Sequence, residues 1–273
     1  MAKLSEIKFV IFDVETTGLE PESGDRVVEI GAVKAEGTNI IERFHSLINP
    51  GVSVSRGAFA VNGITSEMLE NAPPPLEVIP RFMDFIKGEN ALFAYNANFD
   101  ESFMKNELKL INEVFPSELL TIDILAMARA LIPNLLSYKL SGVAKHFEIA
   151  KPQKHRAADD VEMSFEILQK LFSIFKAQGY DEFSYICNLF CIDKQVTDKA
   201  ISERIAEIEE AISLGVKLKI RYFSVFRGEF TEREVMPLEI IKQEGKYCLV
   251  GYCHLRAEER TFMIDGILHL EIV

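Results

Sequence analysis

Two carboxylates spaced two residues apart, Asp13 and Glu15, stand where the first apolar run of the chain ends. Residues two apart on a strand point to the same face, so the pair would lie side by side just before the turn at 16–18. Adjacent carboxylates repel each other, and strand-to-turn junctions are common places for metal sites. The pair therefore indicates a metal-binding centre, with a solvated acidic strand end as the alternative.

Three further residues that could do chemistry stand near the ends of expected elements. Asp100 follows an apolar run at 91–95, and it either caps the helix that begins after it or projects at the same sheet end as Asp13. His155 precedes an expected helix, and Asp160 lies in the first turn of that helix, where a carboxylate interacts favourably with the helix dipole. Each position has an ordinary structural explanation, so none of them alone indicates a function.

Taken together, three blocks that contain these residues resemble the three exonuclease motifs of the DnaQ-like 3′–5′ exonucleases. The blocks are Asp13–Gly18, Asn96–Asp100 and His155–Asp160, and the last has the H-x-A-x-x-D form of the DEDDh branch. Supporting matches occur at 48–50, 62–65, 121–123, 128–129 and 138–140. The resemblance covers about residues 7–175 with order and spacing intact. It departs from the family pattern at Tyr95, where the family more often has histidine, and this concerns substrate contacts more than catalysis.

The resemblance implies that Asp13, Glu15, Asp100 and Asp160 hold two divalent ions, Mg²⁺ or Mn²⁺, the hard cations that oxygen ligands favour. Two such ions about 3.5–4 Å apart stabilise both the attacking and the leaving oxygen in phosphodiester cleavage. His155 is expected to take a proton from the attacking water, a role suited to a group whose unperturbed pKa is about 6.5. The product would be a nucleoside 5′-monophosphate.

Contacts to the substrate are implied as well. The residues expected to bind it are Thr16, Thr17, Gly18, Leu19, Phe59, Asn96, Lys154 and Arg156. Gly18 would let the backbone approach the terminal nucleotide, and Leu19 or Phe59 would pack against the terminal base.

The loop around His155 is basic, with Lys151, Lys154 and Arg156. These side chains would contact phosphates of the incoming strand, unless they form an ordinary solvated loop. Asp159 adjoins this loop in the expected helix, but adjacent helix residues point about 100° apart, so we expect Asp159 to be solvated and not to join the acidic set.

The elements that must position these residues follow from the apolar periodicity. It predicts strands at 8–14, 27–34, 39–48, 91–95 and 119–122 and helices at 76–86, 99–111, 124–131 and 158–176. Three strands with short polar connections predict an antiparallel meander, and the alternation that follows predicts a mixed sheet. The expected fold class is α/β, a ribonuclease-H-like mixed sheet flanked by helices, over a domain at 1–178.

The rest of the chain predicts a helical linker at 179–202 and a small all-β, barrel-like domain at 203–273. The expected elements are a short helix at 183–190, a polar linker at 196–199, a helix at 203–212 and strands at 217–225, 232–241, 246–253 and 259–267. This domain resembles a WYL domain at 220–222, 233–238, 247–252 and 260–262. The Trp-Tyr-Leu sequence for which the WYL domain is named is Tyr247-Cys248-Leu249 in this chain. A contact that the tryptophan ring makes in the family is therefore in doubt here.

WYL domains are associated with binding nucleic acid or a nucleotide-like ligand. The residues expected to do so here are Lys217, Lys219, Arg221, Tyr222, Arg233, Tyr252 and Arg260. The first three alternate along a strand, so they share one face, and the tyrosines would offer stacking surfaces. The alternative is a solvated strand face with tyrosines in the core.

Composition narrows the classes of protein. The chain of 273 residues is 48% hydrophobic, which excludes global disorder, and it carries a net charge of −12, which excludes nonspecific coating of nucleic acid but not a nuclease. No apolar stretch approaches the roughly 18–20 residues of a membrane span, and no secretory signal is evident at the N-terminus. The cysteines, at 187, 191, 248 and 253, predict buried reduced thiols in a cytoplasmic protein, with a zinc clip as the alternative.

The sequence thus predicts a metal-dependent 3′–5′ exonuclease that acts on single-stranded 3′ ends, DNA favoured over RNA, with an appended WYL module. The alternatives are a 3′–5′ exoribonuclease and a sensor that uses the same fold only to bind. Polymerase association, the WYL ligand and the oligomeric state are left open.

Overall fold

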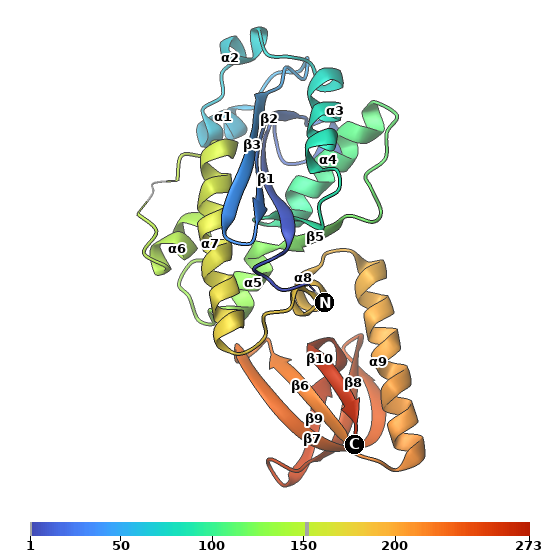
Figure 1. Ribbon diagram of the computed structural model, residues 1–273. Coiled ribbons are helices and arrows are strands. Elements are labelled where there is room, and N and C mark those ends of the chain that lie inside the picture. Colours follow the sequence, from blue (N-terminus) through green and yellow to red (C-terminus); the bar gives the residue numbers. More distant parts are fainter. Residues whose placement is uncertain (1, 151–152) are drawn as a thin grey trace. The chain divides into compact units, whose positions relative to one another are not determined.

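The computed structural model describes residues 2–150 and 153–273, which form two compact units (Figure 1). The first unit extends to Arg129 and continues from Leu135 to Phe183. The second contains the short segment Ala130–Asn134 together with Ser184–Val273. Each unit has its own sheet.

The first unit is built on a mixed five-stranded sheet, in the order β3-β2-β1-β4-β5. Its strands are β1 (Lys8–Thr16), β2 (Val27–Glu36), β3 (Asn39–Leu47), β4 (Ala91–Ala94) and β5 (Leu120–Asp123). The first three form the predicted antiparallel meander, and β4 and β5 add parallel to β1. The carboxyl ends of β1 and β4 therefore meet at the same edge of the sheet, which is where Asp13, Glu15 and Asp100 stand in the chain.

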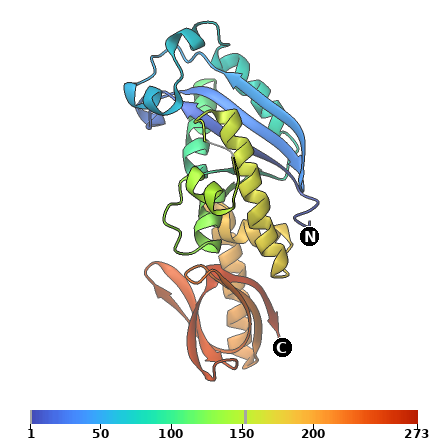
Figure 2. The same cartoon turned by 90° about the vertical axis from the view of Figure 1, so that its left-hand side faces the viewer.

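Helices cover both faces of this sheet (Figure 2). They are α1 (Arg56–Asn62), α2 (Ser66–Glu70), α3 (Pro75–Ile86), α4 (Ala97–Leu110), α5 (Ile124–Leu131), α6 (Leu140–His146) and α7 (Ala157–Ala177), with a short 3₁₀ turn, η1 (Pro21–Ser23). Phe9 and Phe12 of β1 point to opposite faces, because side chains alternate along a strand. Phe9 packs against Phe172 of α7, and Phe12 packs against Phe82 of α3. These contacts confirm the predicted mixed sheet flanked by helices.

Three short helices of this unit were absent from the sequence-based prediction. For α1 the local sequence explains the structure afterwards: the Ser55 hydroxyl accepts from the Ala58 N–H at the start, and Gly63 ends the helix in the left-handed region. At seven, five and seven residues, α1, α2 and α6 are too short for apolar periodicity to reveal them.

The second unit is an all-antiparallel sheet in the order β10-β6-β7-β8-β9 that curls beside a helix (Figure 2). Its elements are α8 (Phe183–Phe190), α9 (Lys194–Leu214), β6 (Leu218–Ser224), β7 (Glu229–Gln243), β8 (Lys246–Cys253), β9 (Glu258–Met263), the 3₁₀ turn η2 (Ile264–Gly266) and β10 (Ile267–Ile272). Ile208 and Ala211 of α9 complete a core with Leu249 and Phe262 of the sheet. All four cysteines are free and buried, as the thiol interpretation predicts.

Two predictions for this unit were wrong. Residues 196–199 are not a linker but part of α9, which runs unbroken from Lys194 and is capped by the Asp193 carboxylate. The strand predicted at 259–267 is not continuous: β9 ends at Met263, η2 follows, and a fifth strand, β10, begins at Ile267 and pairs with β6. Within the described residues, no helix combines the length and apolar character that a membrane crossing requires.

Helix α7 begins in close contact with Gly31 of β2. A Cβ at this position would lie 2.4 Å from the carbonyl carbon of Ala157, at the first residue of α7. Glycine is therefore required for α7 to begin directly over β2, and the start of α7 carries Asp160.

We expect Gly31→Ala to lower the free energy of unfolding by about 1–3 kcal/mol, because the added methyl group overpacks the strand–helix contact. Urea denaturation measures the effect. Gly57→Ala is the matched control, since its Cβ would meet only the Ser55 hydroxyl oxygen, at 3.9 Å. A Gly31→Ala protein as stable as the wild type would contradict the close packing described here.

Candidate active site

A single pocket of about 700 Å³ at the carboxyl end of β1 contains the acidic residues singled out in the sequence. Asp13, Glu15, Asp100, Asp160 and His155 all line it. They come from β1, from the first turn of α4, and from the start of α7 with the loop before it. The fold thus brings together residues from three separate blocks of the chain.

Asp100 is held against β1. Its side chain is buried, and Oδ1 accepts a hydrogen bond from the Val14 N–H at 3.0 Å. Helix α4 begins at Ala97, after Asn96 in the left-handed region, so Asp100 lies inside the first turn and does not cap the helix. Of the two alternatives, the structure supports a side chain at the same sheet end as Asp13.

Asp160 and His155 are linked by the side-chain amide of Gln153. The Gln153 Nε2 donates to Asp160 Oδ2 at 2.8 Å and lies 3.4 Å from His155 Nδ1. His155 is exposed and has φ 52°, a left-handed conformation. Asp160 is buried, and its second oxygen, Oδ1, has no hydrogen-bond partner among the described residues. Asp159 points elsewhere, to the Lys154 ammonium group at 2.8 Å.

The four pocket carboxylates share an unfavourable electrostatic environment. Burial, together with the charges of Asp100, Glu15 and Asp160, raises the pKa of Asp13 well above its ordinary value. Burial also raises the pKa of Asp100, and that of Asp160. For Glu15, burial and the nearby charges of Glu29 and Asp160 raise the pKa to about 8. The pocket therefore concentrates negative charge without enough positive charge to balance it.

The turn after Glu15 forms one wall of the pocket. Thr16, Gly18 and Leu19 line it, and Leu19 is largely exposed at 75%. Thr17 is buried and does not line the pocket, and its hydroxyl donates to Asp25 Oδ1 at 3.0 Å. A Cβ on Gly18 would lie 2.2 Å from the Asp25 carboxylate, so glycine is needed here for the turn to pack on Asp25.

Sequence reasoning missed several residues that line the pocket, among them the polar residues Asp25 and Gln153. Asp25 stands before a strand, where an acidic turn residue is unremarkable. Gln153 stands two residues before His155, and no rule of spacing identifies an amide. Both act by orienting a neighbour, which only the three-dimensional contacts reveal.

The remaining residues expected to contact substrate are placed as follows. Phe59 is half exposed on α1 and does not line the pocket, and neither does Asn96. Lys154 is paired with Asp159, and Lys151 lies outside the described residues. Tyr95, the departure from the family pattern, does line the pocket, and its hydroxyl donates to the Tyr138 carbonyl at 2.6 Å.

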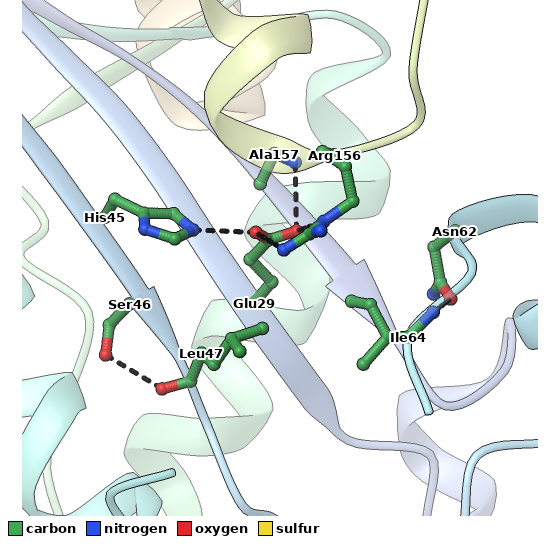
Figure 3. A network of polar contacts seen from close by, with 8 residues as sticks. All are labelled: Glu29, His45, Ser46, Leu47, Asn62, Ile64, Arg156 and Ala157. Atoms are coloured by element: carbon green, nitrogen blue, oxygen red, sulfur yellow. Dashed lines mark hydrogen bonds and ion pairs between the residues drawn. The ribbon is translucent and has the colours of Figure 1, made fainter. Parts of the chain in front are cut away.

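Arg156 is engaged by Glu29 of β2 (Figure 3). Its Nε donates to Glu29 Oε2 at 3.0 Å, and its Nη2 donates to Glu29 Oε1 at 2.7 Å. The guanidinium group is therefore held in a two-pronged ion pair, and its predicted contact with substrate stays a prediction.

The basic face predicted for the second unit is paired with acidic residues of β7. Lys217 contacts the Glu234 carboxylate, and Arg221 Nε lies 3.2 Å from Glu232. Lys219 is exposed opposite Glu234.

The four remaining predicted binding residues differ in their surroundings. The Tyr222 ring packs edge-on against Phe262 in the core, and Tyr252 is exposed at 40%. Arg260 pairs with Glu258, whereas Arg233 has a buried Nη1 with no hydrogen-bond partner. Binding by these residues stays a prediction.

Comparison with known proteins identifies both regions of the chain. The model of the Exonuclease family matches residues 10–168, more than half of the chain. The chain belongs to the Exonuclease family. The WYL domain model matches residues 203–272. These matches confirm the two resemblances stated from the sequence.

Two relatives within the Exonuclease family are DNA polymerase III proteins. The DNA polymerase III subunit epsilon of Treponema pallidum is 38% identical over 169 residues, which make up 61% of this chain and 77% of that protein. The PolC-type DNA polymerase III of Caldanaerobacter subterraneus subsp. tengcongensis is 36% identical over 196 residues, 72% of this chain but only 14% of the polymerase. The chain thus spans a small part of the PolC-type relative.

A solved structure shows the same fold. Escherichia coli exonuclease I, crystallised with a dA16 oligonucleotide, aligns with a TM-score of 0.58 at 18% identity, over 91% of this chain and 55% of that one. At this identity the likeness concerns the fold, and it agrees with the predicted fold class.

The raised pKa of Glu15 predicts how stability depends on pH. A group whose folded pKa lies above its unfolded value, here about 8 against 4.5, stabilises the fold fully at low pH and less as pH rises toward 8. In EDTA, we expect the free energy of unfolding to fall between pH 5.5 and 8, by at most about 1.4 kcal/mol per pH unit for one such group. Urea denaturation at each pH measures the slope.

Glu15→Gln should flatten this slope, because the amide does not titrate. Glu20→Gln, an exposed change in the neighbouring turn, should leave the slope as it is. A slope that is the same in all three proteins would contradict the electrostatic description of the pocket.

Proposed function

We propose that the protein is a metal-dependent 3′–5′ exonuclease that releases nucleoside 5′-monophosphates from single-stranded 3′ ends, with DNA favoured over RNA. The observation that carries the proposal is the pocket in which four carboxylates and His155 meet. Family membership supports hydrolysis of a phosphodiester, and the names of the two relatives support DNA as substrate. A cavity of about 700 Å³ is large enough for a terminal nucleotide.

The donor set in the pocket fits divalent cations. Asp13, Glu15, Asp100 and Asp160 offer only oxygen ligands, and the buried Asp160 Oδ1 atom has no partner in the part of the chain that the structure describes. A cation would provide the missing partner and remove the mutual repulsion of the carboxylates. In this structure, no three His, Cys, Asp or Glu side chains among the described residues are close enough together to bind one metal ion. We therefore expect the pocket carboxylates to move when a cation binds. When bound, Mg²⁺ or Mn²⁺ supplies charge stabilisation and a more acidic water.

The side chains of the chain itself bind, orient and move a proton. Asp100 is fixed by the Val14 N–H, so its second oxygen is directed by the backbone of β1. His155 is exposed at the mouth of the pocket, where its ring can accept a proton from water, and Gln153 lies within reach of its Nδ1 atom. The turn Thr16–Leu19 offers a backbone wall and the exposed Leu19 side chain to the terminal nucleotide.

The second unit is proposed to bind nucleic acid or a nucleotide-like ligand. Support comes from the match to a WYL domain, from the exposed Tyr252 ring and from the unpaired Nη1 atom of Arg233. The ion pairs of Lys217 and Arg221 reduce the free positive charge on β6, so the aromatic ring contributes more to this proposal than the basic face does.

Asp100→Ala should abolish cleavage, because the side chain lines the pocket, and the fold should stay intact. The assay uses single-stranded DNA and RNA of matched sequence, labelled at the 5′ end, with Mn²⁺ or with EDTA. The wild type should give a metal-dependent ladder that shortens from the 3′ end, faster on DNA. Faster shortening of RNA would make the protein an exoribonuclease, and binding without cleavage would make it a sensor. An active Asp100→Ala protein would contradict the assignment of Asp100 as a metal ligand.

His155→Asn should lower kcat by about 10²–10⁴-fold, the usual contribution of a general base, while Mn²⁺ binding is retained. The rate should also lose its dependence on pH between 6 and 8. Lys176→Gln is the control, because Lys176 is exposed in the last turn of α7, outside the pocket lining. If the pH profile of His155→Asn matched that of the wild type, another group would be the base.

A further inference from the structure

Glu29 is a buried carboxylate that does not line the pocket, yet four hydrogen-bond donors converge on it (Figure 3). Arg156 donates twice, from Nε and Nη2. The Ala157 N–H donates to Oε2 at 3.1 Å, and His45 Nε2 of β3 lies 2.7 Å from Oε1. The carboxylate thus joins β2, β3 and the start of α7.

The hydrogen bonds that Glu29 accepts lower its pKa by more than burial raises it. Burial by itself would raise the pKa of Glu29, but the bonds from Arg156, His45 and Ala157 lower it below its ordinary value. Glu29 is therefore ionised near neutral pH, and a charged acceptor makes the strongest bonds to a guanidinium group. The charge of Glu29 raises the pKa of Glu15 by more than the charge of Arg156 lowers it.

The residues at the start of α7 that donate to Glu29 lie between two pocket residues of this part of the chain, His155 and Asp160. Arg156 follows His155, whose backbone is in the left-handed region and needs support to stay there. The Arg156 carbonyl also accepts from the Asp160 N–H at 3.0 Å, in the first turn of α7. Fixing Arg156 and Ala157 on β2 therefore fixes both the His155 turn and the Asp160 backbone.

The strand that carries Glu29 is paired directly with the strand that carries the other carboxylates. Glu15 of β1 is opposite Glu29 of β2 in the antiparallel register, and Asp13 is opposite Gly31. The side chain of Glu29 and the close contact at Gly31 together lock α7 to the strand beside Asp13 and Glu15.

We propose that Glu29 is a positioning residue for the reaction: through Arg156 and the Ala157 N–H, it sets His155 and Asp160 in place relative to Asp13 and Glu15. The inference rests on the proposed function for its kinetic consequence. Its structural part, the placement of His155, does not depend on any activity.

Glu29→Gln tests the proposal with little change of shape, since the amide keeps one acceptor but loses the charge and the two-pronged pair. We expect kcat to fall about 10–100-fold with KM changed less than about 3-fold, because misplacement of reacting groups by about 1 Å costs up to about 100-fold in rate. Arg156→Lys, which keeps the charge but not the fork, should give a smaller loss in the same parameter.

Glu89→Gln is the matched control. Glu89 is half-buried, and its Oε1 atom lies 3.2 Å from Nζ of Lys34, which is on β2 like Glu29. Neither Glu89 nor Lys34 lines the pocket. Its loss removes an ion pair from the same strand without touching the start of α7. The control should keep the wild-type kcat even where its melting temperature falls as far as that of Glu29→Gln.

A double-mutant cycle identifies the route of the effect. If Glu29 acts through Arg156, then Glu29→Gln with Arg156→Gln should be no slower than the slower single variant. Losses that multiply would overturn this route, as would a wild-type kcat in Glu29→Gln.

A second measurement keeps the inference separate from the proposed function. Proton–carbon NMR of histidine-labelled protein reports on the His155 ring, assigned with His155→Asn. The His155 resonance should shift or broaden in Glu29→Gln and stay unchanged in Glu89→Gln. A wild type that cleaves nothing would defeat the proposed function, whereas an unshifted His155 resonance in Glu29→Gln would overturn the positioning.

Discussion

The mutual repulsion of four carboxylates in one pocket is the constraint on which the rest of the first unit depends. Asp13, Glu15, Asp100 and Asp160 come from three elements, and their raised pKa values show that the fold holds them together against their charges. Such an arrangement is costly in a protein without a cation, and it is typical of a site where function, and not stability, has determined the residues.

The fold meets this cost with rigid supports on each contributing element. The backbone of β1 holds Asp100, and Gln153 holds Asp160. Glu29 and Gly31 of β2 hold the start of α7, one by hydrogen bonds and the other by the absence of a side chain. A helix that begins directly on a strand, and a buried ion pair beside it, are thus consequences of the need to bring α7 to the end of β1.

The sequence predicted the central part of this account because the acidic residues stand at ends of long, strongly apolar elements. The strand that carries Asp13, the strand that precedes Asp100 and the helix that carries Asp160 are each evident from periodicity, and the order of the motifs identified the family. The spacing alone did not decide whether Asp100 caps a helix. The Val14 N–H contact decided it, and that contact joins residues 86 positions apart.

What the sequence did not reveal depends on contacts between distant residues or on weak local patterns. Glu29 and Arg156 form hydrogen bonds although they are 127 residues apart in the sequence. The position of a Glu on a buried strand does not indicate which residue it pairs with. Residues 196–199 appeared as a polar linker because their helix is amphipathic only weakly, with few buried positions along α9. The fifth strand of the second unit, β10, has mostly exposed residues in its second half, so its apolar pattern is short.

The most direct test of the central claim is anomalous diffraction from crystals grown with Mn²⁺ and a nucleoside 5′-monophosphate. The account predicts two manganese peaks about 3.5–4 Å apart, bounded by Asp13, Glu15, Asp100 and Asp160, with the phosphate of the nucleotide beside them. Manganese bound elsewhere, or nucleotide in the pocket with no metal beside these carboxylates, would contradict it.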